Sequence, residues 1–158
     1  PIGAYGGGKV LMEEMAPVGS IYQAGTLSGN PIAVSAGIAT LELLNDEVYE
    51  KLESMGSYFE NELNKVFDKY DHEIHLERIG SMFSLFFHSD PIRSVGDVEK
   101  CNFKLFSKYF HCLLRAGIYI APSQYEVGFI SYAHDRKILD FTISTIDEIL
   151  NEIMVSVS

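Results

Sequence analysis

Apolar residues recur every three or four positions along three long stretches of the chain, each beside a polar face. This spacing predicts amphipathic helices from about Asp46 to Lys69, Asp97 to Ala116 and Asp135 to Met154. The apolar positions of the first are Val48, Leu52, Met55, Phe59, Leu63 and Val66 or Phe67. Those of the last are Ile138, Phe141, Thr145, Ile149 and Ile153. Each helix should bury one side and expose the other.

A different pattern fills the segment from Ile32 to Leu44, which carries only small or apolar residues until Glu42. Asn30 and Pro31 suit the N-cap and first position of a helix. A helix without a polar face is expected to be buried on nearly all sides and to belong inside something larger. In this chain alone it should lack its usual partners, so we expect self-association. A shorter helix is expected around 9–15.

Short apolar runs predict strands near His75 to Leu76, Met82 to His88, Ile118 to Ala121 and Gly128 to Tyr132. They alternate with the helices along the chain. This order predicts an α+β fold, a two-layer α/β arrangement in which helices cover one face of a sheet. The composition changes after about Asn30, where a stretch rich in Gly, Ala, Ser and Pro gives way to the helical segments.

Composition narrows the class of protein. The chain has 158 residues, 47% of them hydrophobic, and a formal net charge of −10. With 12 scattered Lys and Arg, nucleic acid and anionic membranes are not expected as partners. No apolar run approaches the length of a membrane span, and no targeting segment is visible. The start without Met suggests a fragment, and a cytoplasmic location is expected. Cys101 and Cys112, expected three turns apart on one helix, should be reduced.

The first glycine-rich segment resembles a phosphate-binding P-loop. Gly3, Gly8 and Lys9 satisfy G-x-x-x-x-G-K, but Val10 replaces the required Ser or Thr, and no strand precedes the loop. A connector packed against other backbone is the better interpretation. The P-loop alternative predicts magnesium-dependent nucleotide binding.

Other polar residues give weaker signals. His72 and His75 stand with Asp71, Glu73 and Glu77, but without a metal-binding spacing, so a solvated turn is favoured. The remaining polar candidates are single histidines and one serine outside any hydrolase motif: His88, His111, His134 and Ser123.

Two loops carry more specific chemistry. In QAGTLSGNP, 23–31, the hydroxyl of Thr26 and two glycines precede a helix N-terminus, an arrangement that can bind phosphate. An ordinary capped loop is the alternative. In APSQYEVGF, 121–129, Glu126 lies between two expected strands and is either solvated or functional.

Four segments together resemble the class III group of pyridoxal-phosphate (PLP) aminotransferases, of fold type I, and within it the aminomutases. They are PIGAYGGG, APVGSIYQAGTLSGNPIAVSAGIATLELL, GSMFSLFF and APSQYEVGFIS. The resemblance covers essentially the whole chain and corresponds to the C-terminal part of the family protein. It implies that 1–45 is the end of the large PLP-binding domain and that 46–158 is the C-terminal small domain.

The resemblance also implies roles for individual residues. Thr26, with Gly25, would bind the cofactor phosphate across the interface of a homodimer, and Tyr22 would lie near the active-site entrance. Glu126 occupies a position where related ω-aminotransferases carry an arginine that binds a substrate carboxylate, which favours an aminomutase. The implied reaction converts the small molecule glutamate 1-semialdehyde to 5-aminolevulinate for tetrapyrrole (porphyrin and heme) synthesis, through a diamine and with PLP or its pyridoxamine form.

The Schiff-base lysine of this family lies upstream of the position that matches Pro1, so Lys9 is not that residue. The chain alone is therefore expected to be inactive and to hold no covalent PLP, with no catalytic residue and no metal of its own. Two alternatives remain: a fragment of another class III transaminase, and a non-catalytic dimerisation module.

Overall fold

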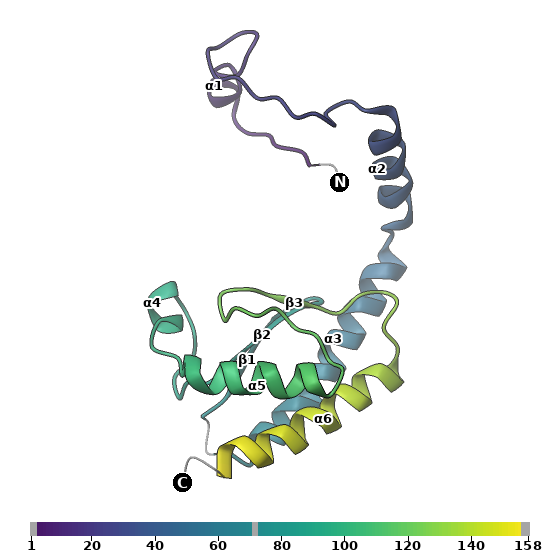
Figure 1. Cartoon of the computed structure of the whole chain (residues 1–158). Helices are drawn as coiled ribbons and strands as arrows, with labels where there is room; N and C mark the ends of the chain where they lie inside the picture. Colours follow the sequence, from purple (N-terminus) through teal and green to yellow (C-terminus); the bar gives the residue numbers. More distant parts are fainter. Residues whose placement is uncertain (1–2, 71–72, 156–158) are drawn as a thin grey trace. The chain divides into compact units, whose positions relative to one another are not determined.

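The computed structural model describes residues 3–70 and 73–155 and divides into two compact units (Figure 1). Unit 1 comprises residues 1–45 and unit 2 residues 46–158. Unit 1 contains the four-residue helix α1, Lys9–Met12, and the helix α2, Pro31–Leu43. The assignment of these units to the two domains of a PLP enzyme stays a prediction.

The start of α2 is as the sequence predicts. The side-chain oxygen of Asn30 accepts hydrogen bonds from the amides of Ile32, at 3.0 Å, and Ala33, at 3.2 Å, and Pro31 is the first helical residue. These contacts satisfy two of the amides that every helix start leaves without an intrahelical partner. Asn30 therefore fixes where the helix begins.

In the part of this chain that the structure describes, α2 lacks the apolar partners that its composition calls for, as the sequence predicts. Among its residues only Gly37 is buried, whereas the side chains of Ile32 and Leu41 are 81% and 68% exposed. The apolar pattern predicts that α2 needs neighbours on most sides. Among the described residues, unit 1 has only α1 and connecting segments to cover it. The apolar surface of α2 is therefore open.

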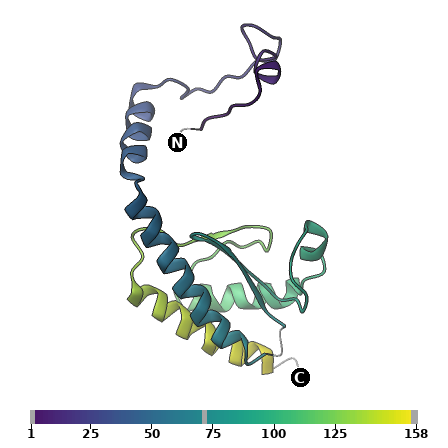
Figure 2. The same ribbon diagram turned by 180° about the vertical axis from the view of Figure 1, so that it is seen from behind.

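Unit 2 combines three long helices with a small antiparallel sheet, and the predicted α+β class is confirmed (Figures 1 and 2). The helices are α3, Asp46–Phe67, α5, Phe103–Arg115, and α6, Arg136–Val155. The strands are β1, His75–Ile79, β2, Met82–Phe86, and β3, Gly128–Phe129, in the order β1-β2-β3. In the part of the chain that the structure describes, no helix is long and apolar enough to cross a membrane.

A two-residue turn joins β1 to β2. Ile79 and Met82 are partners in the ladder, and Gly80 has a φ of 58°, a conformation that side chains disfavour. Arg78 ties this hairpin to α3, because its guanidinium donates to the Gly80 carbonyl at 2.7 Å, to Glu60 at 2.7 Å and to Glu53 at 2.9 Å. The sheet is thus attached to α3 by a half-buried cation as well as by apolar packing.

The core lies between the sheet and the helices. Alternate residues of β2 point to opposite faces, so Leu85 enters the main core while Phe86 packs with Val98 and Cys101 in a smaller cluster. The side chains of Leu113, Leu150 and Ile153 are fully buried. Figure 2 shows α3 and α6 of this layer from the side opposite to Figure 1. Unit 2 therefore has its own continuous core.

The helix predicted from about Asp97 to Ala116 is wrong at its start, because the structure has two helices there. The short helix α4 spans Val95–Val98 and α5 begins at Phe103. The break is caused by Asn102, whose side chain accepts from the Leu105 amide at 3.0 Å while its own amide donates to the Phe87 carbonyl at 2.9 Å. Cys101 consequently lies between the helices rather than on the helix of Cys112, and both thiols are free and buried.

Two further predictions fail in unit 2. Residues 118–121 form no strand, and the last strand contracts to the two residues of β3. The predicted inner face of α6 is confirmed at Thr145, Ile149 and Ile153, which are buried. It is wrong at Ile138 and Phe141, which are exposed, whereas Leu139 and Ile146 are buried. An apolar run in a sequence does not show whether it will pair with a strand. Here the residues of such a run pack against the core as irregular backbone.

Candidate functional site

The segment 25–30 forms a turn immediately before α2. The Ser28 amide donates to the Gly25 carbonyl at 2.9 Å, and the Asn30 amide donates to the Leu27 carbonyl at 3.1 Å. Thr26 is exposed at this turn, and neither its hydroxyl nor its amide has a partner among the residues that the structure describes. The turn therefore presents a hydroxyl donor and a backbone donor together.

The helix start itself is less available than the sequence suggests. The Asn30 side chain already accepts from the Ile32 and Ala33 amides, which are the donors that a phosphate at a helix N-terminus would use. A phosphate at this loop must therefore rely on Thr26 and the turn amides.

Gly25 is not required by the fold. A Cβ added at Gly25 would lie 2.9 Å from the Ser28 hydroxyl oxygen, which can rotate away. The backbone at this position therefore does not need glycine, and the space beside it is open to a small group. Tyr22, the remaining expected site residue of unit 1, is exposed.

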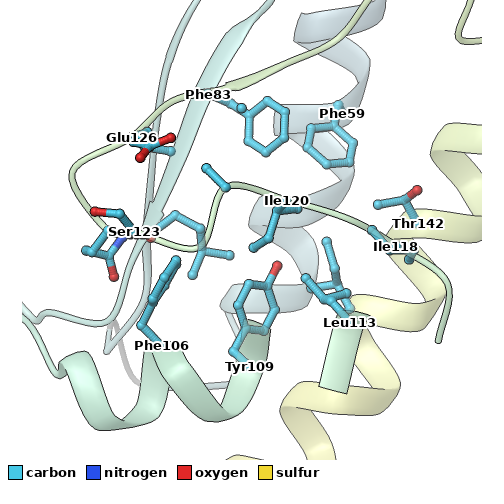
Figure 3. A pocket seen from close by; sticks show the side chains of 16 residues that line it. Phe59, Phe83, Phe106, Tyr109, Leu113, Ile118, Ile120, Ser123, Glu126 and Thr142 are labelled. Carbon is cyan, nitrogen blue, oxygen red and sulfur yellow. Dashed lines mark hydrogen bonds between the residues drawn. The ribbon is translucent and has the colours of Figure 1, made fainter. Parts of the chain in front are cut away.

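Unit 2 contains a narrow pocket of about 50 Å³ between β2, the helices α3, α5 and α6, and the irregular segment 118–127 (Figure 3). It adjoins a wider hollow of about 590 Å³, and Glu126, Phe59 and Phe83 line both. We call this wider space the apolar hollow, because its walls are largely hydrophobic: Phe59, Phe83, Ile118, Ile120, Phe129 and Phe141.

Glu126 is held by its backbone rather than by its side chain. Its amide donates to the Ser123 carbonyl at 3.1 Å, and its carbonyl accepts from the Ser84 hydroxyl at 3.2 Å. No hydrogen bond within the described residues engages its carboxylate, which lies beside Phe83 in Figure 3. An anionic acceptor at the edge of an apolar space suits a ligand that carries an amine.

Sequence reasoning missed Gln124, which lies two residues before Glu126. Its side chain is only 4% exposed, and its amide nitrogen donates to the Leu85 carbonyl of β2 at 2.5 Å. The signal available in the sequence was a polar residue inside a segment flanked by apolar runs. Its partner, however, lies 39 residues away, beyond any local pattern.

The other residues that the sequence offers for a metal or nucleotide site do not form one in the part of the chain that the structure describes. Asp71 and His72 lie outside the described residues, and no group of three or more potential metal ligands occurs in the remainder. The His75 side chain contacts the Ser89 carbonyl at 3.0 Å, and His134 accepts from the Ser131 amide. In the P-loop-like segment the described residues before α1 form no strand, and Lys9 pairs with Glu13.

Two curated relatives illustrate what the chain resembles. It is 44% identical over 156 residues to a glutamate-1-semialdehyde 2,1-aminomutase of Syntrophomonas wolfei, covering 98% of this chain and 36% of that protein. It is 46% identical over 149 residues to the protein of the same name from Geotalea daltonii, covering 94% and 35%. The chain thus spans about a third of the length of the curated relatives it matches.

Solved structures agree on the fold. A β-phenylalanine aminotransferase from Variovorax paradoxus superposes with a TM-score of 0.79 at 23% identity, over 93% of this chain and 34% of that one. A glutamate-1-semialdehyde aminomutase from Pseudomonas aeruginosa, in complex with PMP, gives 0.74 at 20% identity, over 87% and 31%. The aminotransferase class III family profile matches residues 1–153, so the chain belongs to the class III aminotransferase family.

Proposed function

We propose that the chain supplies the cofactor-phosphate turn and a substrate-facing carboxylate to a PLP-dependent aminomutase that converts glutamate 1-semialdehyde to 5-aminolevulinate. The observation that carries this proposal is the carboxylate of Glu126 at the edge of the apolar hollow, which has no hydrogen-bond partner among the described residues. The names of the curated relatives, at 44% and 46% identity, support the same activity. Because the chain spans a third of their length, the complete activity needs the remainder of such a protein.

The turn at Thr26 fits the phosphate of PLP. A phosphate dianion accepts short hydrogen bonds from hydroxyl and amide donors, and Thr26 offers one of each without a competing partner in the described residues. Gly25 leaves room for close approach. The Lys, Arg, Asp and Glu side chains described in unit 1 are Lys9, Glu13, Glu14 and Glu42, so unit 1 provides these donors without an excess of positive charge. A contribution from a second subunit, as in a homodimer, is part of the proposal.

Each site residue of this chain then has a defined task. Thr26 binds and orients the phosphate, and Tyr22 borders the entrance. The Glu126 carboxylate attracts the ammonium groups of an amine substrate and accepts their hydrogen bonds, whereas an arginine there would repel them. The cofactor, when bound, supplies the electron sink and the exchangeable amino group. Discrimination between the aminomutase and a sibling transaminase rests on Glu126.

A chimera tests the proposal. The 158 residues replace the matching segment of the Geotalea daltonii relative, which brings in the remaining two thirds. We expect 5-aminolevulinate production with bound PLP. Thr26→Val keeps the side-chain volume but removes the hydroxyl, so PLP affinity should fall about 10- to 100-fold, the effect of one hydrogen bond to a charged group.

Thr26→Ser is the matched control, because it keeps the donor and should retain most of the affinity. Equal PLP affinity in all three chimeras would refute the role of Thr26. A chimera that transaminates other amines but forms no 5-aminolevulinate would favour the sibling transaminase. A folded, dimeric chimera without PLP would favour the dimerisation module.

A further inference from the structure

The side chain of Gln124 replaces a backbone hydrogen bond that β3 would otherwise make with β2. The Ser81 carbonyl accepts from the Ile130 amide on the β3 side of β2. Carbonyls two and four residues further along a strand point the same way, so that of Leu85 also faces the β3 side. The pairing of β3 with β2 ends at Gly128 and Phe83. The side-chain amide of Gln124 donates to the Leu85 carbonyl instead of a backbone amide.

This substitution allows the chain to leave the sheet. Continuing the register Met82↔Phe129 and Phe83↔Gly128 would place Glu126 opposite Leu85 as a strand residue. Instead, residues 123–126 form a turn, closed by the bond from the Glu126 amide to the Ser123 carbonyl. The Ser84 hydroxyl holds the Glu126 carbonyl from the neighbouring position of β2. The carboxylate of Glu126 thereby lines the apolar hollow.

Stability alone does not explain the buried side chain of Gln124. Its side-chain oxygen is buried and has no hydrogen-bond partner within the described residues. A buried acceptor without a donor costs free energy, so such groups in native proteins call for an explanation. Positioning of the turn explains it, since only the amide nitrogen is needed for that task.

We infer that Gln124 is a positioning residue that holds the turn 123–126 so that the Glu126 carboxylate meets the amine of the substrate. This inference rests on the proposed role of Glu126. It assigns Gln124 no contact with the substrate or the cofactor. It also predicts that the loss of Gln124 loosens the turn more than it weakens the fold.

The variant Gln124→Met separates the two effects. Methionine has nearly the same volume, and it exchanges one unsatisfied acceptor, the glutamine oxygen, for another, the Leu85 carbonyl. The melting temperature of the full chain should therefore change little. Hydrogen exchange of the Glu126 amide should accelerate about tenfold, because its bond to Ser123 opens with the turn. Tyr125→Phe, an exposed change in the same turn, should leave that rate unchanged.

Unchanged exchange at Glu126, or faster exchange throughout unit 2 with a lower melting temperature, would overturn the inference. In the chimera, Gln124→Met should reduce kcat/KM, and should add nothing once Glu126→Gln is present. Additive losses would overturn action through Glu126. An inactive parent chimera would count against the proposed function only, because the exchange measurement on this chain decides the role of Gln124 separately.

Discussion

At the scale of the residue, Asp97 shows how charge orders a short segment. Its carboxylate accepts from the Lys100 ammonium at 3.0 Å, the Ser94 hydroxyl at 2.9 Å and the Arg93 amide at 3.2 Å. These donors, Lys100 foremost, lower the pKa of Asp97 to about 2. The contacts fix the start of α4, which carries Val98 of the smaller cluster.

A depressed pKa makes the stability from Asp97 depend on pH. The contribution is complete above the pKa of an unfolded Asp, about 4, and is lost as the pH falls towards about 2. Wild type should therefore melt above Asp97→Asn at pH 6, and the difference should shrink between pH 4 and 2. Thermal melts across this range measure it. Glu99→Gln removes a neighbouring charge without these contacts, and an equal pH dependence for it would contradict the argument.

Sequence reasoning at this scale proposes Thr26 and Glu126 as site residues, which stay predictions, and does not select Gln124. Loop position and residue type are visible in a sequence. The proposed role of Gln124 depends on the Leu85 carbonyl, 39 residues away, and on the residue at which β3 ends. No local sequence pattern encodes either.

At the scale of the element, α5 shows what helical periodicity does and does not predict. Leu113 is fully buried in the main core, whereas the adjacent Leu114 is 45% exposed. Truncation of a buried leucine loses transfer free energy and leaves a cavity. Leu113→Ala should lower the free energy of unfolding by about 2–5 kcal/mol.

Leu114→Ala is the matched control, since it is the same substitution one position along, and it should cost well under half as much. Urea unfolding of both variants, followed by circular dichroism, makes the comparison. Equal losses would mean that the two faces of α5 are wrongly assigned.

The long amphipathic helices α3 and α6 were predictable because their polar and apolar positions alternate with the period of a helix. The break before α5 was not predicted: the Asn102 side chain caps α5 locally, but the Asn102 amide also bonds the Phe87 carbonyl, which is 15 residues away in the sequence. The run from Ile118 to Ala121 has the composition of a strand. It forms no strand in the structure, and Ile118 and Ile120 pack against the main core as irregular backbone.

At the scale of the whole molecule, the lysines bear on cofactor attachment. An amine that forms a Schiff base must be unprotonated, which in proteins requires burial or a neighbouring positive charge. Lysines of this chain instead pair with carboxylates at the surface, as Lys65 with Glu62, Lys69 with Asp147 and Lys100 with Asp97. The bond to Asp97 raises the pKa of Lys100.

Incubation of the full chain with PLP, followed by borohydride reduction and peptide mass spectrometry, should therefore give only substoichiometric labelling spread over several lysines. The chimera, treated in the same way, should carry one reduced PLP on a lysine outside the 158 residues. A single stoichiometric adduct on a lysine of this chain would refute the expectation.

The packing of α3 against α6 also has a consequence for biosynthesis. Lys69 binds Asp147, Tyr70 binds Asn151 and Tyr58 binds Asp140, so these contacts join residues 78 to 82 positions apart. Closing so large a loop costs entropy that is recovered only when both helices are present. During synthesis on the ribosome, the face of α3 that packs on α6 stays uncovered until α6 has been translated, so unit 2 completes its folding only after that point.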